Sequence, residues 1–261
     1  MDIEKIKSNL KTESIGKNIV YLDTIDSTNV YAKKVAKDNE HGTLIISEEQ
    51  TAGKGRLGKN WASNSGEGIW MTMILKPKIK IQNAPFVTLV AGAAVVKALN
   101  NLGIDARIKW PNDITLNSKK ICGILTELSA ENESINYIVL GMGINVKTLD
   151  FDQELSTKAT SILKEGFDID RETIIIGILE NFETIYKEYV EKNDKREILI
   201  LNRKFSAIIG KNVYVIENNE RKLKKCLDIN EEGNLLVQDE HGNITEVNSG
   251  EVSVRGENGY V

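Results

Sequence analysis

The hydrophobic pattern divides most of the chain into strands and helices. Short apolar runs, typical of buried strands, occupy residues 19–22, 43–47, 68–75 and 135–145. Strands are also expected at residues 107–110, which end at a proline, and at residues 119–127, where two lysines precede an apolar run. Apolar residues at helical spacing predict helices over residues 26–38, 86–102, 173–190 and 195–202. Because both helices and hairpins join these strands, we expect a mixed β-sheet backed by helices, which is an α+β fold.

Beyond Gly210 the pattern changes to short strands. Five are expected, at residues 212–216, 222–229, 234–238, 244–247 and 252–255. Turn residues such as Asn218-Asn219 and Glu232-Gly233 separate them. A meander of this kind is typical of a small barrel. We therefore predict two domains, a main domain of residues 1–205 and a C-terminal β-barrel of residues 206–261.

A segment rich in glycine and basic residues, residues 50–61, lies between the second and third expected strands. Glycine lets a backbone approach a ligand closely, and the cations favour an anion; the residues are Gly53, Lys54, Gly55, Arg56, Gly58 and Lys59. The letters fit a dinucleotide fingerprint and a P-loop, but both motifs need a helix at their end. Asn60 stands where a P-loop has Ser or Thr, and residues 62–68 are unsuited to a helix. We therefore predict an independent loop, mobile when empty, that closes over an anionic ligand; the alternative is a solvated hairpin tip.

The composition excludes several kinds of chemistry. With 41% hydrophobic and 28% charged residues in 261, the chain is typical of a soluble globular protein, and its net charge of −4 argues against nucleic acid as a partner. Two isolated cysteines and two isolated histidines argue against a disulfide framework, a zinc knuckle and a histidine-based triad, and they fit a reducing cytoplasm. The N-terminus lacks the apolar core of a signal peptide, and the most apolar segment, residues 85–96, is too short to cross about 30 Å of hydrocarbon. No membrane role is indicated.

Three polar groups have two interpretations each. Ser27 and Thr28 stand before a helix, where hydroxyls are usually caps, but ligands also bind at strand-to-helix junctions. Residues 109–113, Lys-Trp-Pro-Asn-Asp, end in the composition of a turn, yet the lysine and the carboxylate also suit a nucleotide or its magnesium. Lys120 precedes an apolar run and by itself indicates a solvated strand edge. Cys122 is interpreted as a small buried strand residue.

Five motifs occur in one order between residues 20 and 146, and the expected barrel follows them. They are Asp26-Ser27-Thr28-Asn29, Gln50 to Trp61, Lys109-Trp110-Pro111-Asn112-Asp113, Lys120-Ile121-Cys122-Gly123-Ile124-Leu125 and Gly141-Met142-Gly143-Ile144-Asn145. In this combination the chain resembles the biotin protein ligase family. Since about twenty residues precede the first expected strand, it looks like the monofunctional type without an N-terminal DNA-binding domain, unless Met1 comes from truncation of a longer gene.

The resemblance implies a class II synthetase-like catalytic domain with a C-terminal SH3-like β-barrel. It implies an ATP-dependent ligase that makes biotinyl-5′-AMP and pyrophosphate from biotin and MgATP, then transfers biotin to one lysine of a biotin carboxyl carrier protein domain. A cytoplasmic protein without nucleic acid or membrane partners is expected, and a homodimer paired through sheet edges stays open. The ligands of magnesium are not predicted, with Asp113 as the candidate.

The resemblance also assigns roles to residues. Lys120 and Arg56 are the expected catalytic residues, because their charges would offset the repulsion between a carboxylate and the α-phosphate. Biotin is expected to contact Ser27, Thr28, Asn29, Gln50, Gly53, Lys54, Gly55, Arg56, Lys120 and Gly123. The adenylate is expected to contact Arg56, Trp61, Lys109, Asn112, Asp113 and Asn145. The family usually has arginine where this chain has Lys54, so a bidentate contact there would become a point charge.

Two alternative functions stay open at this point. A lipoate or octanoate ligase or transferase shares the catalytic fold, although the G-K-G-R-L-G loop and the K-W-P-N-D motif favour biotin. A biotin-responsive regulator without catalysis would bind biotin and ATP but release no pyrophosphate. The sequence predicts neither the carrier protein nor the oligomeric state.

Overall fold

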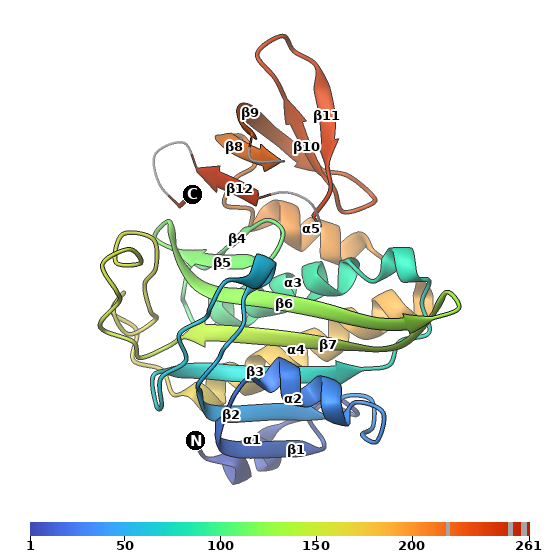
Figure 1. The fold of residues 1–261 in the computed structure, drawn as a ribbon, viewed down its shortest axis with the longest axis vertical. Helices are drawn as coiled ribbons and strands as arrows, with labels where there is room; N and C mark the ends of the chain where they lie inside the picture. Colours follow the sequence, from blue (N-terminus) through green and yellow to red (C-terminus); the bar gives the residue numbers. More distant parts are fainter. Residues whose placement is uncertain (218–219, 250–252, 257–259) are drawn as a thin grey trace.

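The computed structural model describes residues 1–217, 220–249, 253–256 and 260–261, and Figure 1 shows a large sheet below a smaller one. The large sheet has seven strands in the order β1-β2-β3-β7-β6-β5-β4. They are β1 (Ile19–Ile25), β2 (Leu44–Gln50), β3 (Gly68–Leu75), β7 (Ser134–Asn145), β6 (Lys119–Glu131), β5 (Asp113–Leu116) and β4 (Arg107–Lys109). Strands β1 and β2 are parallel, whereas the other neighbours are antiparallel. The mixed sheet predicted from the sequence is confirmed.

Helices pack against both faces of the large sheet, which explains why the central strand β3 is apolar except for Thr72. On one face, α3 (Phe86–Asn101) and α4 (Arg171–Lys192) share a core with side chains such as Met73. On the other face, α2 (Thr28–Val35) packs against a smaller cluster that contains Ile74. Successive residues of a strand point to opposite faces, so all eight residues of β3 are buried. Two shorter helices, α1 (Ile3–Asn9) and α5 (Arg196–Lys204), pack against α4 and α3 respectively. This arrangement confirms the α+β class.

The apolar composition of α3 follows from its central place in the core. Among the described residues, one helical segment, Ile81–Asn101, is long and apolar enough by length and composition to cross a membrane, and it consists of α3 with the short turn that precedes it. However, 67% of its most apolar window is buried inside the protein. It packs against α4, α5 and β6, and Val90 and Ala94 on it are fully buried. The protein core therefore accounts for this apolar sequence.

The small sheet is an antiparallel meander whose last strand returns to its first. Its order is β11-β10-β9-β8-β12, formed by β8 (Asn212–Glu217), β9 (Glu220–Ile229), β10 (Leu235–Gln238), β11 (Ile244–Val247) and β12 (Ser253–Gly256). Its inward residues belong to the same apolar cluster as the main body. The Trp110 indole N–H donates a hydrogen bond to the carbonyl of Gly233, 3.0 Å away, and thereby joins the two sheets.

The structure departs from the expected elements at three places. Helix α1 and strand β5 were not predicted, because α1 has a single fully buried residue, Ile6, and β5 is only four residues long. The run at residues 107–114 is a hairpin, in which β4 and β5 flank a turn at residues 110–112. Between β2 and β3 no helix follows Gly58 up to residue 67, as expected. The predicted turn Asn218-Asn219 and the first residue of the last predicted strand, Val252, lie outside the described residues.

Candidate active site

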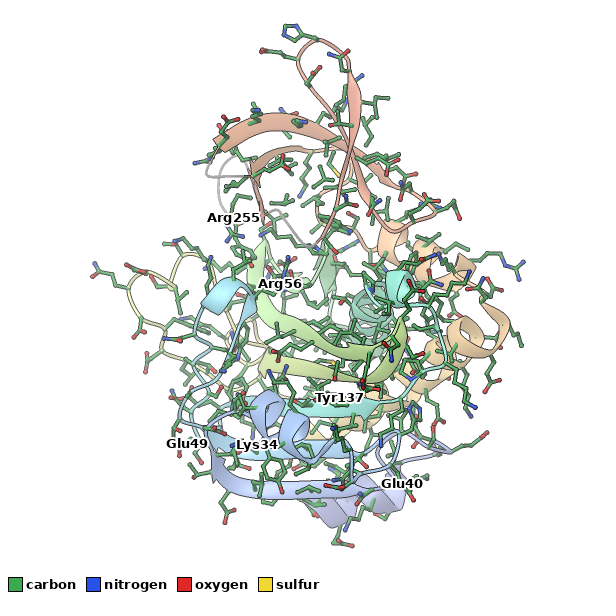
Figure 2. The ribbon with its side chains drawn as sticks, turned by 45° about the vertical axis from the view of Figure 1, so that its right-hand side comes forward. Lys34, Glu40, Glu49, Arg56, Tyr137 and Arg255 are labelled. Atoms are coloured by element: carbon green, nitrogen blue, oxygen red, sulfur yellow. The ribbon has the colours of Figure 1, made fainter. Side chains whose placement is uncertain are left out.

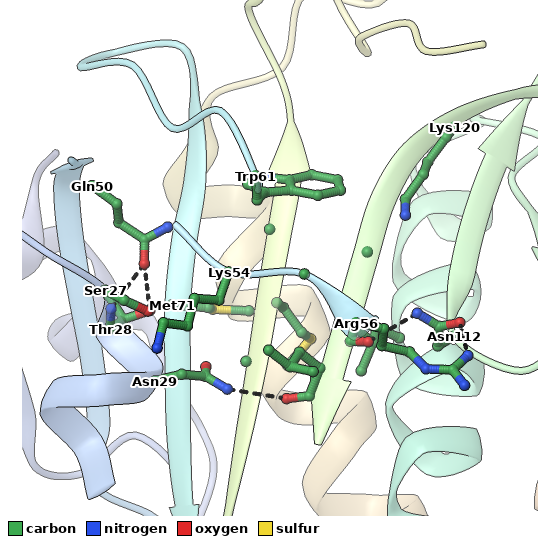
Figure 3. Close-up of a pocket in the computed structure, with 17 residues that line it drawn as sticks. Ser27, Thr28, Asn29, Gln50, Lys54, Arg56, Trp61, Met71, Asn112 and Lys120 are labelled. Atoms are coloured by element: carbon green, nitrogen blue, oxygen red, sulfur yellow. Dashed lines mark hydrogen bonds between the residues drawn. The ribbon is translucent and has the colours of Figure 1, made fainter. Parts of the chain in front are cut away.

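The loop of residues 50–61 returns to the sheet at Trp61, whose indole lies over strands β6 and β7 (Figure 3). Two glycines directly opposite each other in the register, Gly123 and Gly143, form the surface beneath it. A Cβ atom at Gly143 would stand 2.5 Å from Trp61 Nε1, and one at Gly123 would stand 2.8 Å from Cζ3. Real Cβ atoms do not approach that closely, so the absence of side chains here is what allows the indole to lie on the sheet.

A third glycine, Gly141 of β7, lets the first turn of α2 approach the same strands. A Cβ atom at Gly141 would stand 2.0 Å from Asn29 Oδ1. The Asn29 amide donates to the Glu127 carboxylate at 2.9 Å, and Asn29 Oδ1 lies 2.7 Å from the Thr72 hydroxyl. The orientation of this amide is therefore determined on both sides.

Gln50, at the end of β2, joins the loop to the start of α2. Its Oε1 accepts the Thr28 backbone N–H at 2.8 Å and lies 3.0 Å from the Thr28 hydroxyl. Its Nε2 donates to Ser63 Oγ at 2.7 Å. Ser27 occupies the N-cap position of α2, but its hydroxyl makes no capping hydrogen bond. Because Ser27 instead lines the neighbouring cavity, the cap interpretation does not account for its hydroxyl.

These residues surround a narrow cavity of about 40 Å³. Nine of the ten residues predicted to contact biotin line it: Ser27, Thr28, Asn29, Gln50, Lys54, Gly55, Arg56, Lys120 and Gly123. The tenth, Gly53, does not; its carbonyl accepts the Trp61 backbone N–H, and a Cβ atom there would stand 2.4 Å from the Trp61 carbonyl oxygen. The sequence reasoning missed the apolar wall made by Met71, Ile124, Leu125 and Met142. Alternation along the strands gives no signal for these positions, because Ile124 and Leu125 are consecutive on β6 and Met142 lies between two glycines that also line the cavity.

A second, larger cleft of about 610 Å³ opens beside the narrow cavity. All six residues predicted to contact the adenylate line it: Arg56, Trp61, Lys109, Asn112, Asp113 and Asn145. Arg56 and Lys120 border both spaces, so the two cavities meet between these cations. The C-terminal part of the chain adds Arg255, on β12, and Tyr260, beyond β12, to the cleft, and neither was predicted. Figure 2 shows Arg255 above Arg56 across the boundary between the sheets.

Arg56 holds the loop against both sheets. Its Nη1 donates to Asn112 Oδ1 at 2.8 Å, and its Nη2 donates to the carbonyl of Ser249 beyond β11. Burial lowers the pKa of the Arg56 guanidinium and the nearby Asp113 opposes that effect, although an arginine stays charged at any ordinary pH. These two contacts hold the loop next to Asn112 and Ser249.

A compact group of charges lies at the back of the cleft. Lys120 Nζ stands 2.5 Å from Asp113 Oδ1 and 5.0 Å from the centre of the Trp61 ring. Lys109 is 1% exposed, and its ammonium has no hydrogen-bond partner among the described residues. Desolvation lowers the pKa of Lys109 to about 7, with Asp113 acting in the opposite direction. Burial alone would raise the pKa of Asp113, but Lys120 and Lys109 outweigh it and hold that pKa below its usual value.

Two donors in the cleft have no partner within the described part of the chain. One is the Lys109 ammonium and the other is Trp61 Nε1, both of them buried. An unpaired buried donor costs free energy, so native structures seldom retain one unless a ligand satisfies it. The pair therefore indicates a ligand with acceptor oxygens or ring nitrogens that enters from the cleft.

The fold, with two cavities that adjoin at Arg56 and Lys120, is that of a ligase. Residues 21–145 match the model of the biotin/lipoate A/B protein ligase family, and residues 208–255 match the biotin protein ligase C-terminal domain. The chain is 40% identical to the bifunctional ligase/repressor BirA of Bacillus subtilis, over 91% of this chain and 74% of that protein. The biotin--[acetyl-CoA-carboxylase] ligase of Mycobacterium tuberculosis is 29% identical, over 81% of this chain and 78% of the relative.

Solved structures give the same result. The biotin protein ligase of Aquifex aeolicus in complex with biotin and ATP superposes on this chain with a TM-score of 0.80 at 30% identity. The match covers 92% of this chain and 100% of the Aquifex chain. The chain belongs to the biotin protein ligase family. The C-terminal match is to a domain that is named for biotin protein ligases.

Proposed function

We propose that the protein joins biotin to ATP, giving biotinyl-5′-AMP and pyrophosphate, and then transfers the biotinyl group to a lysine of a biotin carboxyl carrier protein domain. The observation that carries the proposal is the meeting of two cavities at Arg56 and Lys120. The narrow cavity offers amide and hydroxyl groups for a ureido ring beside an apolar wall. The cleft offers cations and an indole for a nucleotide.

Biotin would enter with its ring toward Thr28 and Gln50 and its carboxylate toward Lys120. This direction is supported by the polar groups at one end of the narrow cavity and by the cations at the other (Figure 3). Lys54 lies between them, on the side of Thr28 and Asn29 (Figure 3). Its backbone and its single charge would support the valerate chain in place of the arginine usual in the family.

The cations make the first step feasible. A carboxylate that attacks an α-phosphate brings two anions together, and at a separation of ~4 Å and an effective dielectric of ~20 their repulsion is about 4 kcal/mol. Arg56, Lys109 and Lys120 all line the cleft, which supports a role for their charges where the carboxylate and the phosphate would meet. Lys120 is paired with Asp113 in this structure, and it would exchange that partner for the reacting oxygens. Catalysis then rests on positioning and charge stabilisation, and no enzyme nucleophile is required.

Magnesium would accompany the nucleotide rather than reside in the protein. No cluster of three or more histidine, cysteine or carboxylate side chains occurs in the described residues. Asp113, 8% exposed at the back of the cleft, is a carboxylate at hand. Magnesium commonly uses one or two carboxylates together with substrate phosphates and water, so this donor set fits an ion delivered with ATP. The ion would neutralise phosphate charge.

Cys122 takes no part in this chemistry. It is fully buried, and desolvation raises the pKa of its thiol far above neutrality, so no thiolate is available. The sequence interpretation as a small buried strand residue is confirmed.

In the second step the closed loop would protect the mixed anhydride from water until an acceptor lysine arrives. Arg56 supports this role because it holds the loop to Asn112 and Ser249. We place the reaction in the cytoplasm with biotin, ATP and a carrier domain as partners, without nucleic acid or membrane. A homodimer through sheet edges is compatible with the fold. We also propose that residues 1–205 form the catalytic domain and residues 206–261 a C-terminal domain of its own fold, since the second family model begins at residue 208 and β8 begins at Asn212.

The test is biotin-dependent exchange of labelled pyrophosphate into ATP, followed by mass spectrometry of an added carrier domain. Exchange with biotin, none with lipoate, and a carrier heavier by one biotinyl group are expected. Binding of both ligands without exchange would instead favour the non-catalytic regulator. Exchange with lipoate in place of biotin would make the protein a lipoate ligase.

A further inference from the structure

Tyr260 brings a phenol from the far end of the sequence into the cluster of charges. Its hydroxyl donates to Asp113 Oδ2, although the two residues are 147 positions apart. The Lys109 ammonium lies 3.6 Å from the centre of its ring. Tyr260 also lines the large cleft. The Tyr260 side chain therefore contacts both Asp113 and Lys109, which are the anion and the most buried cation of this group of charges.

The Tyr260 hydroxyl determines how the Asp113 carboxylate is turned. Asp113 Oδ1 faces Lys120 Nζ at 2.5 Å and lies 3.3 Å from Asn112 Nδ2. Oδ2 is held by Tyr260. A carboxylate bound through both oxygens has little freedom to rotate, so Lys120 meets a fixed acceptor. Without the phenol, Oδ2 would be left unpaired inside the protein.

The Tyr260 ring attracts the Lys109 ammonium, which has no hydrogen-bond acceptor of its own in the described residues. The face of an aromatic ring attracts a cation. Arg255 lies 5.6 Å from the centre of the same ring, so a second positive group is near the phenol. The ring holds Lys109 in place without using up its N–H donors, which remain available to an incoming phosphate.

We propose that Tyr260 is a positioning residue for the polyphosphate of ATP: it orients Asp113 through its hydroxyl and holds Lys109 through its ring. This inference rests on the proposed function, because it concerns the nucleotide half of the same site. It assigns the small sheet a specific contribution to nucleotide binding. Biotin contacts are not involved, since Tyr260 does not line the narrow cavity.

Two substitutions separate the two contacts. Tyr260→Phe keeps the ring over Lys109 but removes the hydrogen bond to Asp113, and Tyr260→Ala removes both. Pyrophosphate exchange is measured with ATP varied at saturating biotin, and with biotin varied at saturating ATP. Loss of a hydrogen bond to a charged group should raise the KM for ATP about tenfold in Tyr260→Phe. Loss of the ring as well should raise it about a hundredfold in Tyr260→Ala.

The KM for biotin should stay at the wild-type value in both variants, which a general structural defect would not allow. Tyr214→Phe is the matched control, since Tyr214 is another phenol of the small sheet in contact with an arginine, Arg221, but outside the cleft. It should leave both constants unchanged. Because Tyr260→Phe preserves the volume of the side chain, the test survives a failure of Tyr260→Ala to fold.

An unchanged KM for ATP in Tyr260→Phe would overturn the inference. A lowered KM in either variant would do so as well, because the phenol would then be obstructing the nucleotide. Calorimetric titration of ATP alone into each variant gives the same comparison without turnover. If the wild-type protein binds ATP but catalyses no exchange with biotin, the proposed function fails, whereas the effect of Tyr260 on ATP affinity is still measured.

Discussion

Replacing Gly143 with alanine should damage nucleotide use while leaving the fold intact. The new Cβ atom would stand 2.5 Å from Trp61 Nε1 and 2.6 Å from Cε2, whereas ordinary contacts begin near 3.4 Å. The indole must therefore move outward by about 1 Å. Trp61 belongs to a loop and Gly143 to a central strand paired on both sides, so the loop gives way rather than the sheet.

The displacement moves the unpaired Trp61 Nε1 away from the position where a nucleotide would meet it, and it lifts the ring from Lys120. A misplacement of about 1 Å can reduce a rate by about a hundredfold, so kcat/KM for ATP should fall by that order. The free energy of unfolding, measured in urea, should change by less than about 1 kcal/mol, because no core contact is lost.

Gly92→Ala serves as the control, since a Cβ atom at this buried glycine of α3 meets its nearest neighbour, Ile108, at 3.9 Å. Both activity and fold should survive there, with a gain of up to about 1 kcal/mol from helix propensity. A double-mutant cycle makes the test strict. In a Trp61→Ala background, Gly143→Ala should have no further effect on kcat/KM for ATP. If it still reduces the rate a hundredfold, the steric argument is refuted.

Three further outcomes are expected. Lys120→Ala should slow biotin-dependent pyrophosphate exchange about a hundredfold or more, whereas its neighbour Lys119→Ala, outside both cavities, should not; equal rates in the two variants would remove Lys120 from the site. Arg56→Ala should lower single-turnover adenylation about tenfold and release biotinyl-5′-AMP into solution, as followed by chromatography, and full retention of the intermediate would contradict the loop's role. Glu48→Gln should destabilise the protein at pH 7: desolvation would raise the pKa of Glu48, but Arg171 and Tyr21 outweigh it and lower that pKa to about 2. The interactions of Glu48 stabilise the protein above the unfolded-state pKa of 4.5, and this stabilisation is lost as the pH falls toward 2. In urea unfolding the wild type should therefore be more stable than Glu48→Gln by about 1–2 kcal/mol at pH 7, after allowance for solvent screening, and the difference should vanish as the pH falls from 4.5 to 2. A difference that stays constant over this range would refute the assignment.

The large sheet was predictable because burial on both faces leaves a strong signal in the sequence. Strand β3 is apolar from Ile69 to Leu75 except for Thr72, and a short run of this kind is typical of a strand covered on both sides. Helix α3 shows the same kind of signal. In contrast, α1 has one fully buried residue and a largely polar surface, so its periodicity is too weak to predict a helix.

Local motifs predicted the candidate site better than its walls. The loop of residues 50–61 is one continuous stretch of sequence, and so is the motif that begins at Lys120, so each could be compared with known motifs. Tyr260 meets Asp113 across 147 positions, and no local pattern reports a contact of that range. The glycines at positions 141 and 143 were visible as letters, but their purpose appears only when the atoms of Asn29 and Trp61 are seen against them.

The hydrogen bond from Trp110 to Gly233 limits how this protein can move. A Cβ atom at Gly233 would stand 2.8 Å from the Leu89 methyl group on α3, which shows how tightly this turn fits the main body. The main body and the small sheet share one apolar core and pack closely at Gly233, so a hinge motion between them would break these contacts. Access for reactants and exit for products would then depend on loops that border the cleft, such as the 50–61 segment, and not on a hinge between the two sheets.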